Sequence, residues 1–175
     1  MNYIYEDQLE SKRLITRRLT LEDVSIWKSF FEDEESTQFI PDFGEINSEE
    51  KAERMIEKQI ERYSENRFGH QALIDKETNE FIGVCGLLTQ IVDGKEEIEV
   101  GYHVLKQFWG NGYAPEAAKL FIDYARKNTI TTSIISVIDI DNFKSQRVAQ
   151  KNGLTIDKQT TFMDLDVFIY RLKLE

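Results

Sequence analysis

The chain has 175 residues, of which 41% are hydrophobic, and no repeat or linker interrupts it, so we expect one domain over residues 1–175 with a sizeable core. Its net charge of −10 argues against nucleic-acid binding, which needs a basic surface, and favours a cationic partner. No run approaches the ~18 apolar residues of a membrane helix, and no signal-peptide pattern opens the chain, so we expect a cytoplasmic protein without membrane contact.

The N-terminal third predicts one strand followed by two helices. The strand is expected over residues 13–18. Thr20 then resembles a helix N-cap, with Asp23 three residues later as in a capping box. Apolar residues follow at helical spacing. A second helix is expected to begin at Ser48, because acidic residues in its first turn suit the helix dipole.

The remainder predicts strands interrupted by two helices. Two good turn sequences separate the first three strands, which indicates an antiparallel meander. The single cysteine, Cys85, lies in an apolar run there and is expected to be a small buried side chain. The expected elements are strands at 68–75, 80–88 and 96–104, a helix at 113–127, a strand at 132–138, a helix from Asn142 closed by Gly153, and a long strand at 161–174.

This order indicates a mixed α/β (α+β) fold. A central, mostly antiparallel mixed sheet of about six to seven strands is expected, with about four flanking helices. The order lacks the regular βαβ alternation of a doubly wound fold.

A glycine-containing turn, Gln107–Ala114, lies between a predicted strand and a helix. A helix start offers unpaired N–H groups and partial positive charge. Gly110 and Gly112 let the backbone approach an anion, so the segment is suited to a pyrophosphate. A tight helix entry with no ligand is the alternative. Neither of the two common phosphate motifs, the P-loop and the dinucleotide fingerprint, is present.

A second motif runs from Asp141 to Leu154. Lys144, Arg147 and Lys151 are spaced so that they fall on one helix face. Either this face meets an anion, or it is an ordinary solvated surface.

Together the two motifs resemble the GCN5-related N-acetyltransferase (GNAT) superfamily, in the branch similar to the ribosomal-protein N-terminal acetyltransferases (RimJ/RimL-like). Gln107–Gly112 is similar to the [Gln/Arg]-x-x-Gly-x-[Gly/Ala] loop, and Asn142–Gly153 to Asn-x-x-Ser-x-Arg-Val-x-x-Lys-x-Gly. Arg13–Asp23, Phe81–Gly86 and Glu99–Tyr102 fit the same branch in the same order. The resemblance therefore covers nearly the whole chain.

The resemblance implies an acetyl-coenzyme A site and no metal. It places the pyrophosphate on the glycine-containing loop and the pantetheine arm along the fourth strand, at a splay between the fourth and fifth strands. The fourth helix adds contacts to the cofactor and its adenosine phosphates. The cofactor-binding residues implied in this way are His103, Val104, Leu105, Gln107, Phe108, Gly110, Asn111, Gly112, Tyr113, Ala114, Asn142, Lys144, Ser145 and Lys151.

Acetyl transfer to an amine needs a base, a donor for the carbonyl oxygen and a proton for the leaving thiolate. Glu99 is the predicted base; Glu97 shares its strand face, so the two carboxylates either attract a cationic acceptor or are simply exposed. The superfamily's usual tyrosine position is Ala149 here, so Ser145 becomes the candidate acid, or else only positions the thiolate. By analogy, the backbone N–H of Val104 would be the donor. His70 receives no role.

Three functions follow from the resemblance. The first is acetylation of a peptide or protein α-amine, and the second is acetylation of a small amine such as an aminoglycoside or polyamine. The third is a non-catalytic acyl-CoA-binding protein, an idea that the missing tyrosine keeps open. The loop at residues 36–47 and the helices around it are expected to select the acceptor. Either a monomer or a homodimer is compatible with the sequence.

Overall fold

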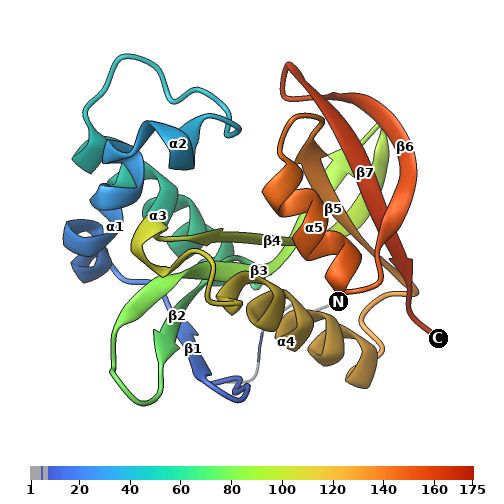
Figure 1. Ribbon diagram of the computed structural model, residues 1–175, viewed down its shortest axis with the longest axis horizontal. Coiled ribbons are helices and arrows are strands. Elements are labelled where there is room, and N and C mark those ends of the chain that lie inside the picture. Colours follow the sequence, from blue (N-terminus) through green and yellow to red (C-terminus); the bar gives the residue numbers. More distant parts are fainter. Residues whose placement is uncertain (1–4, 6–7) are drawn as a thin grey trace.

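The computed structural model describes residues 5 and 8–175, in which seven strands form one sheet of order β1-β2-β3-β4-β5-β7-β6 (Figure 1). Every neighbouring pair is antiparallel except β4 and β5, which are parallel. The strands are β1 (Leu14–Arg18), β2 (Gln71–Asp75), β3 (Phe81–Val92), β4 (Lys95–Val104), β5 (Ser133–Asp139), β6 (Thr155–Phe162) and β7 (Leu165–Lys173).

Helices cover both faces of the sheet (Figure 1). Residues of α1 and α3 pack with Ala72 and Val84 on one face, whereas those of α4 pack with Ile82 and Val100 on the other. The helices are α1 (Val24–Glu32), α2 (Glu34–Thr37), α3 (Ser48–Ser64), α4 (Tyr113–Lys127) and α5 (Phe143–Lys151), with 3-10 turns η1 (Leu21–Asp23) and η2 (Lys106–Phe108).

The sheet splays open between its two parallel strands. The register of β4 and β5 contains one pair, Glu99 with Ile135, whereas β3 and β4 pair along ten residues each. Beyond Val100, β4 therefore continues with one edge unpaired by β5. The splay expected between the fourth and fifth strands is confirmed.

Most expected elements are confirmed within a few residues. Thr20 forms the expected capping box with Asp23, at the start of η1, and α3 begins at Ser48 as expected, with a capping box at Asn47 that was not predicted. Gly153 has φ 83° just after α5, which is the left-handed conformation of a helix end. Cys85 is fully buried, as expected.

The single long strand expected over 161–174 is wrong. Two antiparallel strands, β6 and β7, meet at a turn through Met163 and Asp164, both with positive φ. Neither residue is the glycine that this conformation favours, and β6 is polar and largely exposed, so neither the turn nor the strand had a clear signal. The short helix α2, which overlaps the start of the loop expected at 36–47, was also not predicted.

The described helices include none that is long and apolar enough to cross a membrane. The prediction about the start of the chain falls partly on residues 1–4 and 6–7, which lie outside the described residues.

Candidate active site

The glycine-containing loop presents free backbone donors at the start of α4. Gly110 and Gly112 have φ of 77° and 78°, the left-handed region that glycine tolerates without strain. In the described part of the chain, the N–H groups of Gly110, Asn111 and Gly112 donate no hydrogen bond to protein. A Cβ added to Gly110 would meet nothing within 4 Å. The loop is thus a curled, open set of donors at a helix N-terminus, which fits an anionic group such as a pyrophosphate.

Arg13 holds this loop in place from the start of β1. Its Nε donates to Glu116 Oε2 at 2.7 Å, and its Nη1 donates to the carbonyl oxygen of Asn111 at 2.9 Å. Its guanidinium also lies 4.3 Å from the centre of the Tyr113 ring. Sequence reasoning used Arg13 only as part of a family motif and missed this role, because the contacts join residues about 100 positions apart.

At the open edge of β4, the main-chain N–H and C=O groups of every second residue point into the splay, and those of the residues between them point to β3. Leu105 N–H donates to Ile82 O at 3.0 Å, so the main-chain groups of Leu105 face β3. In an antiparallel ladder the neighbouring residue faces the other way, which directs the N–H and C=O of Val104 into the splay. Of the three residues expected to pair with a pantetheine arm, Val104 is therefore placed for it, whereas His103 and Leu105 are directed to β3.

The carbonyl of Val104 is already used within the protein. It accepts a 2.8 Å hydrogen bond from the indole Nε1 of Trp109. Val100 O, at the closed end of the splay, accepts from the Ser136 hydroxyl at 3.0 Å. The N–H of Val104 thus remains available as a donor, which keeps it as the candidate for the carbonyl oxygen of a thioester.

The first turn of α5 reaches across to β4. Asn142 caps the helix, and its Oδ1 accepts from the N–H of Ser145 at 3.1 Å. The Ser145 hydroxyl lies 2.9 Å from the hydroxyl of Tyr102, on β4. Tyr102 also donates to the carbonyl oxygen of Ser145 at 3.1 Å. In the sequence, Tyr102 was identified only as part of the Glu99–Tyr102 motif and was given no role. Its side chain brings a phenol to the helix whose usual tyrosine position is Ala149.

Lys144 is held at the mouth of the splay. Its Nζ donates to Glu35 Oε1 at 2.8 Å and lies 4.2 Å from the centre of the Trp109 ring. Lys106 joins the same group through Asp33 and Glu35, at 2.8 and 3.1 Å. The helix α2 is thereby tied to both η2 and α5. Lys151, the other lysine predicted to meet an adenosine phosphate, is exposed on α5.

Glu99 is buried where β4 and β5 part. Glu99 is 8% exposed. One of its carboxyl oxygens accepts a hydrogen bond from Gln90 Nε2 at 2.8 Å, and the other accepts one from the N–H of Val137 at 3.3 Å. Burial raises the pKa of Glu99 to about 7, against the pull of these hydrogen bonds. A carboxyl group with this pKa is suited to accept a proton near neutral pH.

Glu97 does not act with Glu99. Both carboxylates lie on one face, as predicted, but Glu97 forms two 3.0 Å hydrogen bonds with the guanidinium of Arg171. This hydrogen bonding lowers the pKa of Glu97. The idea that both glutamates attract the acceptor is therefore incorrect for Glu97, and neither residue is exposed.

Two histidines lie further along the sheet face that carries Glu99: His103 is four residues after it on β4, and His70 packs over Gly101. Their rings are 5.7 Å apart and nearly perpendicular. Burial lowers the pKa of His103 to about 4 and that of His70 well below its usual value, so both are neutral at pH 7. The structure thus agrees with leaving His103 out as a base.

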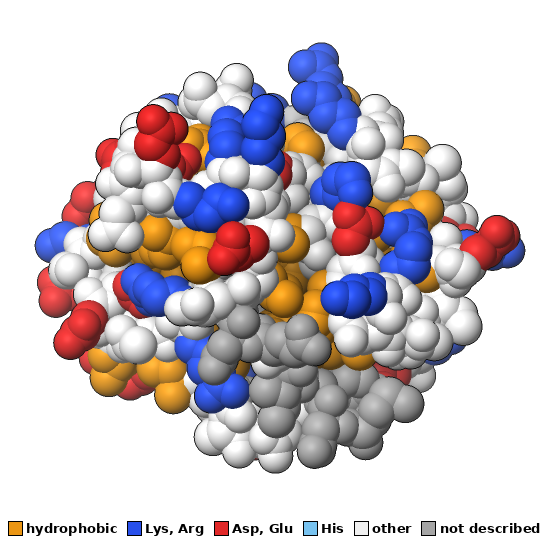
Figure 2. All heavy atoms as spheres, turned by 90° about the horizontal axis from the view of Figure 1, so that it is seen from below, with side chains coloured by type: hydrophobic (Ala, Val, Ile, Leu, Met, Phe, Trp, Pro, Cys, Tyr) orange, Lys and Arg blue, Asp and Glu red, His pale blue; other side chains and the backbone are white. Residues whose placement is uncertain are grey.

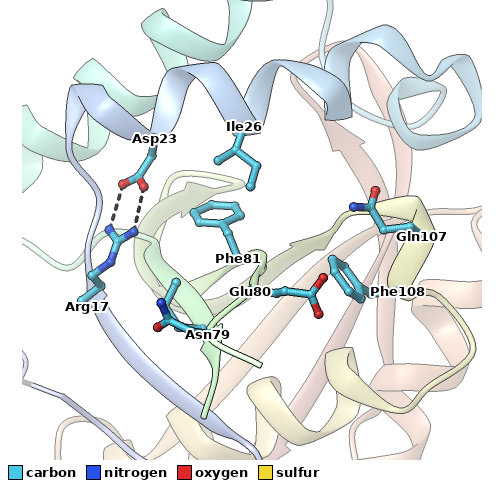
Figure 3. A pocket seen from close by; sticks show the side chains of 9 residues that line it. Arg17, Asp23, Ile26, Asn79, Glu80, Phe81, Gln107 and Phe108 are labelled. Atoms are coloured by element: carbon cyan, nitrogen blue, oxygen red, sulfur yellow. Dashed lines mark hydrogen bonds and ion pairs between the residues drawn. The ribbon is translucent and has the colours of Figure 1, made fainter. Parts of the chain in front are cut away.

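A separate hollow of about 380 Å³ adjoins the loop from the α1 side (Figure 3). Ile26 and Phe81 lie at its centre, the paired Arg17 and Asp23 at one end, and Gln107 at the other. The side chain of Gln107 thus faces this hollow.

On the face seen in Figure 2, Lys and Arg side chains are prominent although the chain is acidic.

The chain is similar to acetyltransferases in sequence and in fold. The family profile described as acetyltransferase (GNAT) domain matches residues 13–155. N-acetyltransferase p20 of Bacillus licheniformis is 28% identical over 95% of this chain and 96% of its own. YkkB of Bacillus subtilis is 35% identical over 99 residues, a match that spans 57% of this chain and 58% of YkkB.

A solved structure extends this similarity to the fold. The ribosomal-protein-S5-alanine acetyltransferase of Vibrio fischeri superposes with a TM-score of 0.75 over 97% of this chain and 98% of its own, at 16% sequence identity.

Proposed function

Since the chain belongs to the GNAT family of acetyl-CoA-dependent acetyltransferases, we propose that it transfers an acetyl group to the α-amine of a peptide or protein N-terminus. The observation that supports this choice of amine is the burial of Glu99 where β4 and β5 part, which raises its pKa to about 7. A free α-amine has a pKa of about 7.7–8.0, whereas a lysine side chain lies near 10.4. The pKa of Glu99 is therefore close to that of an α-amine, so proton transfer between them is nearly balanced. It lies about three units below that of a lysine-like amine, so transfer from such an amine is unfavourable.

Acetyl-CoA supplies an acetyl group activated as a thioester. The residues that fit it are those around the splay: the loop donors of Gly110 to Gly112 for the pyrophosphate, and the open β4 edge at Val104 for the pantetheine arm. Lys144 lies at the mouth, where the adenosine phosphates would be met. We propose that Asn142 acts indirectly, by holding the first turn of α5, because its side-chain oxygen caps that helix.

Three groups are assigned to the chemistry. Glu99 accepts the proton that the attacking amine loses, directly or through water. The N–H of Val104 donates to the carbonyl oxygen of the acetyl group. Ser145 holds a proton for the departing sulfur, and the hydroxyl of Tyr102 at 2.9 Å orients it. These assignments are supported by burial, hydrogen bonding and the direction of main-chain groups.

The test is release of free CoA from acetyl-CoA in the presence of different acceptors. Short peptides with free N-termini, the same peptides blocked at the N-terminus, polyamines and aminoglycosides form the panel. Release with the free peptides only supports the proposal. Release with polyamines or aminoglycosides would move the function to small amines. No release of CoA with any acceptor, together with acetyl-CoA binding in calorimetry, would favour a non-catalytic acyl-CoA-binding protein.

A further inference from the structure

A row of buried side chains on α3 faces the strand that carries Glu99. The buried residues of this helix form one stripe: Ala52, Ile56, Gln59 and Arg62. Ala52 and Ile56 belong to the apolar cluster that includes Val84 on β3. The last two members of the stripe are polar, which is unusual on the buried side of a helix.

The register of the sheet locates this polar end of the stripe. Gly86 pairs with Gly101, and the next pair on the same face joins Leu88 to Glu99. Gln59 accepts from the N–H of His70 at 2.8 Å, and His70 Nε2 lies 3.0 Å from where a Cβ on Gly101 would be. Gln59 is thus level with the Gly86–Gly101 pair.

The stripe then continues beyond that pair. Ile56 packs in the cluster of Val84, and Gln59 is level with Gly86, so α3 advances toward Leu88. Arg62, one turn after Gln59, therefore reaches the level of Leu88 and Glu99. In agreement, burial raises the pKa of Glu99 and lowers that of Arg62, and the opposite charge of each residue partly offsets the shift of the other.

Arg62 is a buried cation whose hydrogen-bonding groups are largely unused. The residue is 7% exposed, and its Nε and Nη1 have no hydrogen-bond partner among the described residues. Both ring nitrogens of His70 are buried without a partner in the same region. Such groups destabilise a fold unless something compensates them.

The other groups around Glu99 do not supply a positive charge to it. His70 and His103 are neutral at pH 7, and Arg171 is paired with Glu97. Lys58, on α3, has a lowered pKa from burial and from the charge of Arg62. Gln90 on β3 and the N–H of Val137 on β5 are uncharged donors.

We propose that Arg62 is a positioning residue for Glu99. The positive charge of Arg62 favours the carboxylate form of Glu99, which is the form that accepts a proton. This inference rests on the proposed function, because it assumes that Glu99 is the base. Glu99 is buried without a directly bonded cation, and a guanidinium that does not contact it supports ionisation without neutralising the base in a tight ion pair.

The first experiment compares Arg62→Met with Arg62→Lys in the full chain. We expect Arg62→Met to move the acid limb of the kcat/KM pH profile upward by about one pH unit, because an opposite charge has been removed. Activity at pH 6 then falls about ten-fold while activity at pH 9 is kept. Arg62→Lys should retain most of the wild-type profile. Equal losses at both pH values would overturn the proposal.

The folded state is checked separately. Removing an unpaired buried guanidinium should leave the melting temperature unchanged or higher. If Arg62→Met gives little folded protein, Arg62→Gln serves as the second uncharged variant.

A direct titration separates this inference from the proposed function. Carbon-13 NMR of labelled glutamate carboxyls, with Glu99→Gln identifying the signal, follows Glu99 without any acceptor. A higher pKa of Glu99 in Arg62→Met supports the inference even if acetyl transfer to α-amines is not found. An unchanged pKa would overturn it even if acetyl transfer is established.

Discussion

The hydroxyl of Tyr102 lies 2.9 Å from the hydroxyl of Ser145, and this contact joins β4 to the first turn of α5 across the opened sheet. Tyr102 also donates to the carbonyl oxygen of Ser145 at 3.1 Å, and either hydroxyl can be the donor in the contact between the two side chains. Burial raises the pKa of Tyr102, which keeps its hydroxyl protonated throughout the working range. The pair therefore offers a fixed hydroxyl beside the edge of β4 on which a thioester would lie.

Replacing either hydroxyl tests this pair. We expect Ser145→Ala to lower kcat about a hundred-fold, as for loss of a general acid, and Tyr102→Phe to lower it less. Because the two act as one unit, the double variant should be no slower than Ser145→Ala. Both variants should keep their affinity for CoA in calorimetry. Full turnover by Ser145→Ala would remove the serine from acid catalysis.

A substrate with a better leaving group distinguishes acid catalysis from a structural effect. With 4-nitrophenyl acetate the leaving group needs no proton, so Ser145→Ala and wild type should react at similar rates. A matching loss with this ester would indicate that the serine only supports the fold of the site.

Arg13 should govern cofactor affinity through the loop. Arg13→Ala removes charged hydrogen bonds to Glu116 and to the Asn111 carbonyl, so we expect the Kd for CoA to rise about ten-fold. Lys12→Ala is the matched control, because Lys12 is an exposed neighbour. Calorimetric titration with CoA measures both. Equal affinities for the two variants would contradict the loop-holding role.

Glu35 should compete with the cofactor for Lys144. Glu35→Gln removes a carboxylate that holds Lys144 Nζ at 2.8 Å. Because an exposed ion pair contributes little, the affinity for CoA should rise by about two-fold. Lys144→Met should weaken CoA binding, and it should weaken dephospho-CoA binding less. If both ligands respond equally to Lys144→Met, the lysine does not meet the 3′-phosphate.

Glu99 should make stability depend on pH in an unusual direction. Its pKa is about 7 in the folded protein and near 4.5 when exposed, so the folded state favours the protonated form. The stability associated with that proton is present below about pH 4.5 and is lost as pH rises to about 7. This difference corresponds to a free energy on the order of 3 kcal/mol.

Glu99→Gln removes this titration. Relative to wild type, the variant should gain unfolding free energy between pH 5 and pH 8, as measured by urea denaturation at both values. Glu97→Gln is the contrasting control, because the pKa of Glu97 is lowered and its pairing with Arg171 stabilises the fold at neutral pH. The same free-energy difference at both pH values for Glu99→Gln would contradict a raised pKa.

The parts of the fold that the sequence predicts are those with local signals. A capping residue located the helical segment after Thr20, acidic residues in the first turn located α3, and the glycine turn located the start of α4. The turn at Met163 and Asp164 was missed because positive φ is not typical of methionine, so β6 and β7 were read as one strand. Local patterns thus predict elements but not every break between them.

In the site, too, the residues with a local sequence signal were predicted and those that depend on long-range contacts were not. The loop and Glu99 were predicted from the family motifs, and the structure adds burial as the cause of the raised pKa of Glu99. Glu97 was misjudged because its partner, Arg171, lies 74 positions away in the sequence. Tyr102 was identified only as the end of a family motif, and Arg62 carried no signal, because their contacts come from strand register and from the direction of α3 across the sheet.

The measurement that tests the central claim most directly is CoA release from acetyl-CoA by wild type and by Glu99→Gln. The acceptors are one peptide with a free N-terminus and the same peptide blocked there, with mass spectrometry locating the acetyl group. We predict release and α-amine acetylation by wild type with the free peptide only, and a loss of about a hundred-fold in Glu99→Gln. Equal turnover by the two proteins, or release with the blocked peptide, would contradict the account.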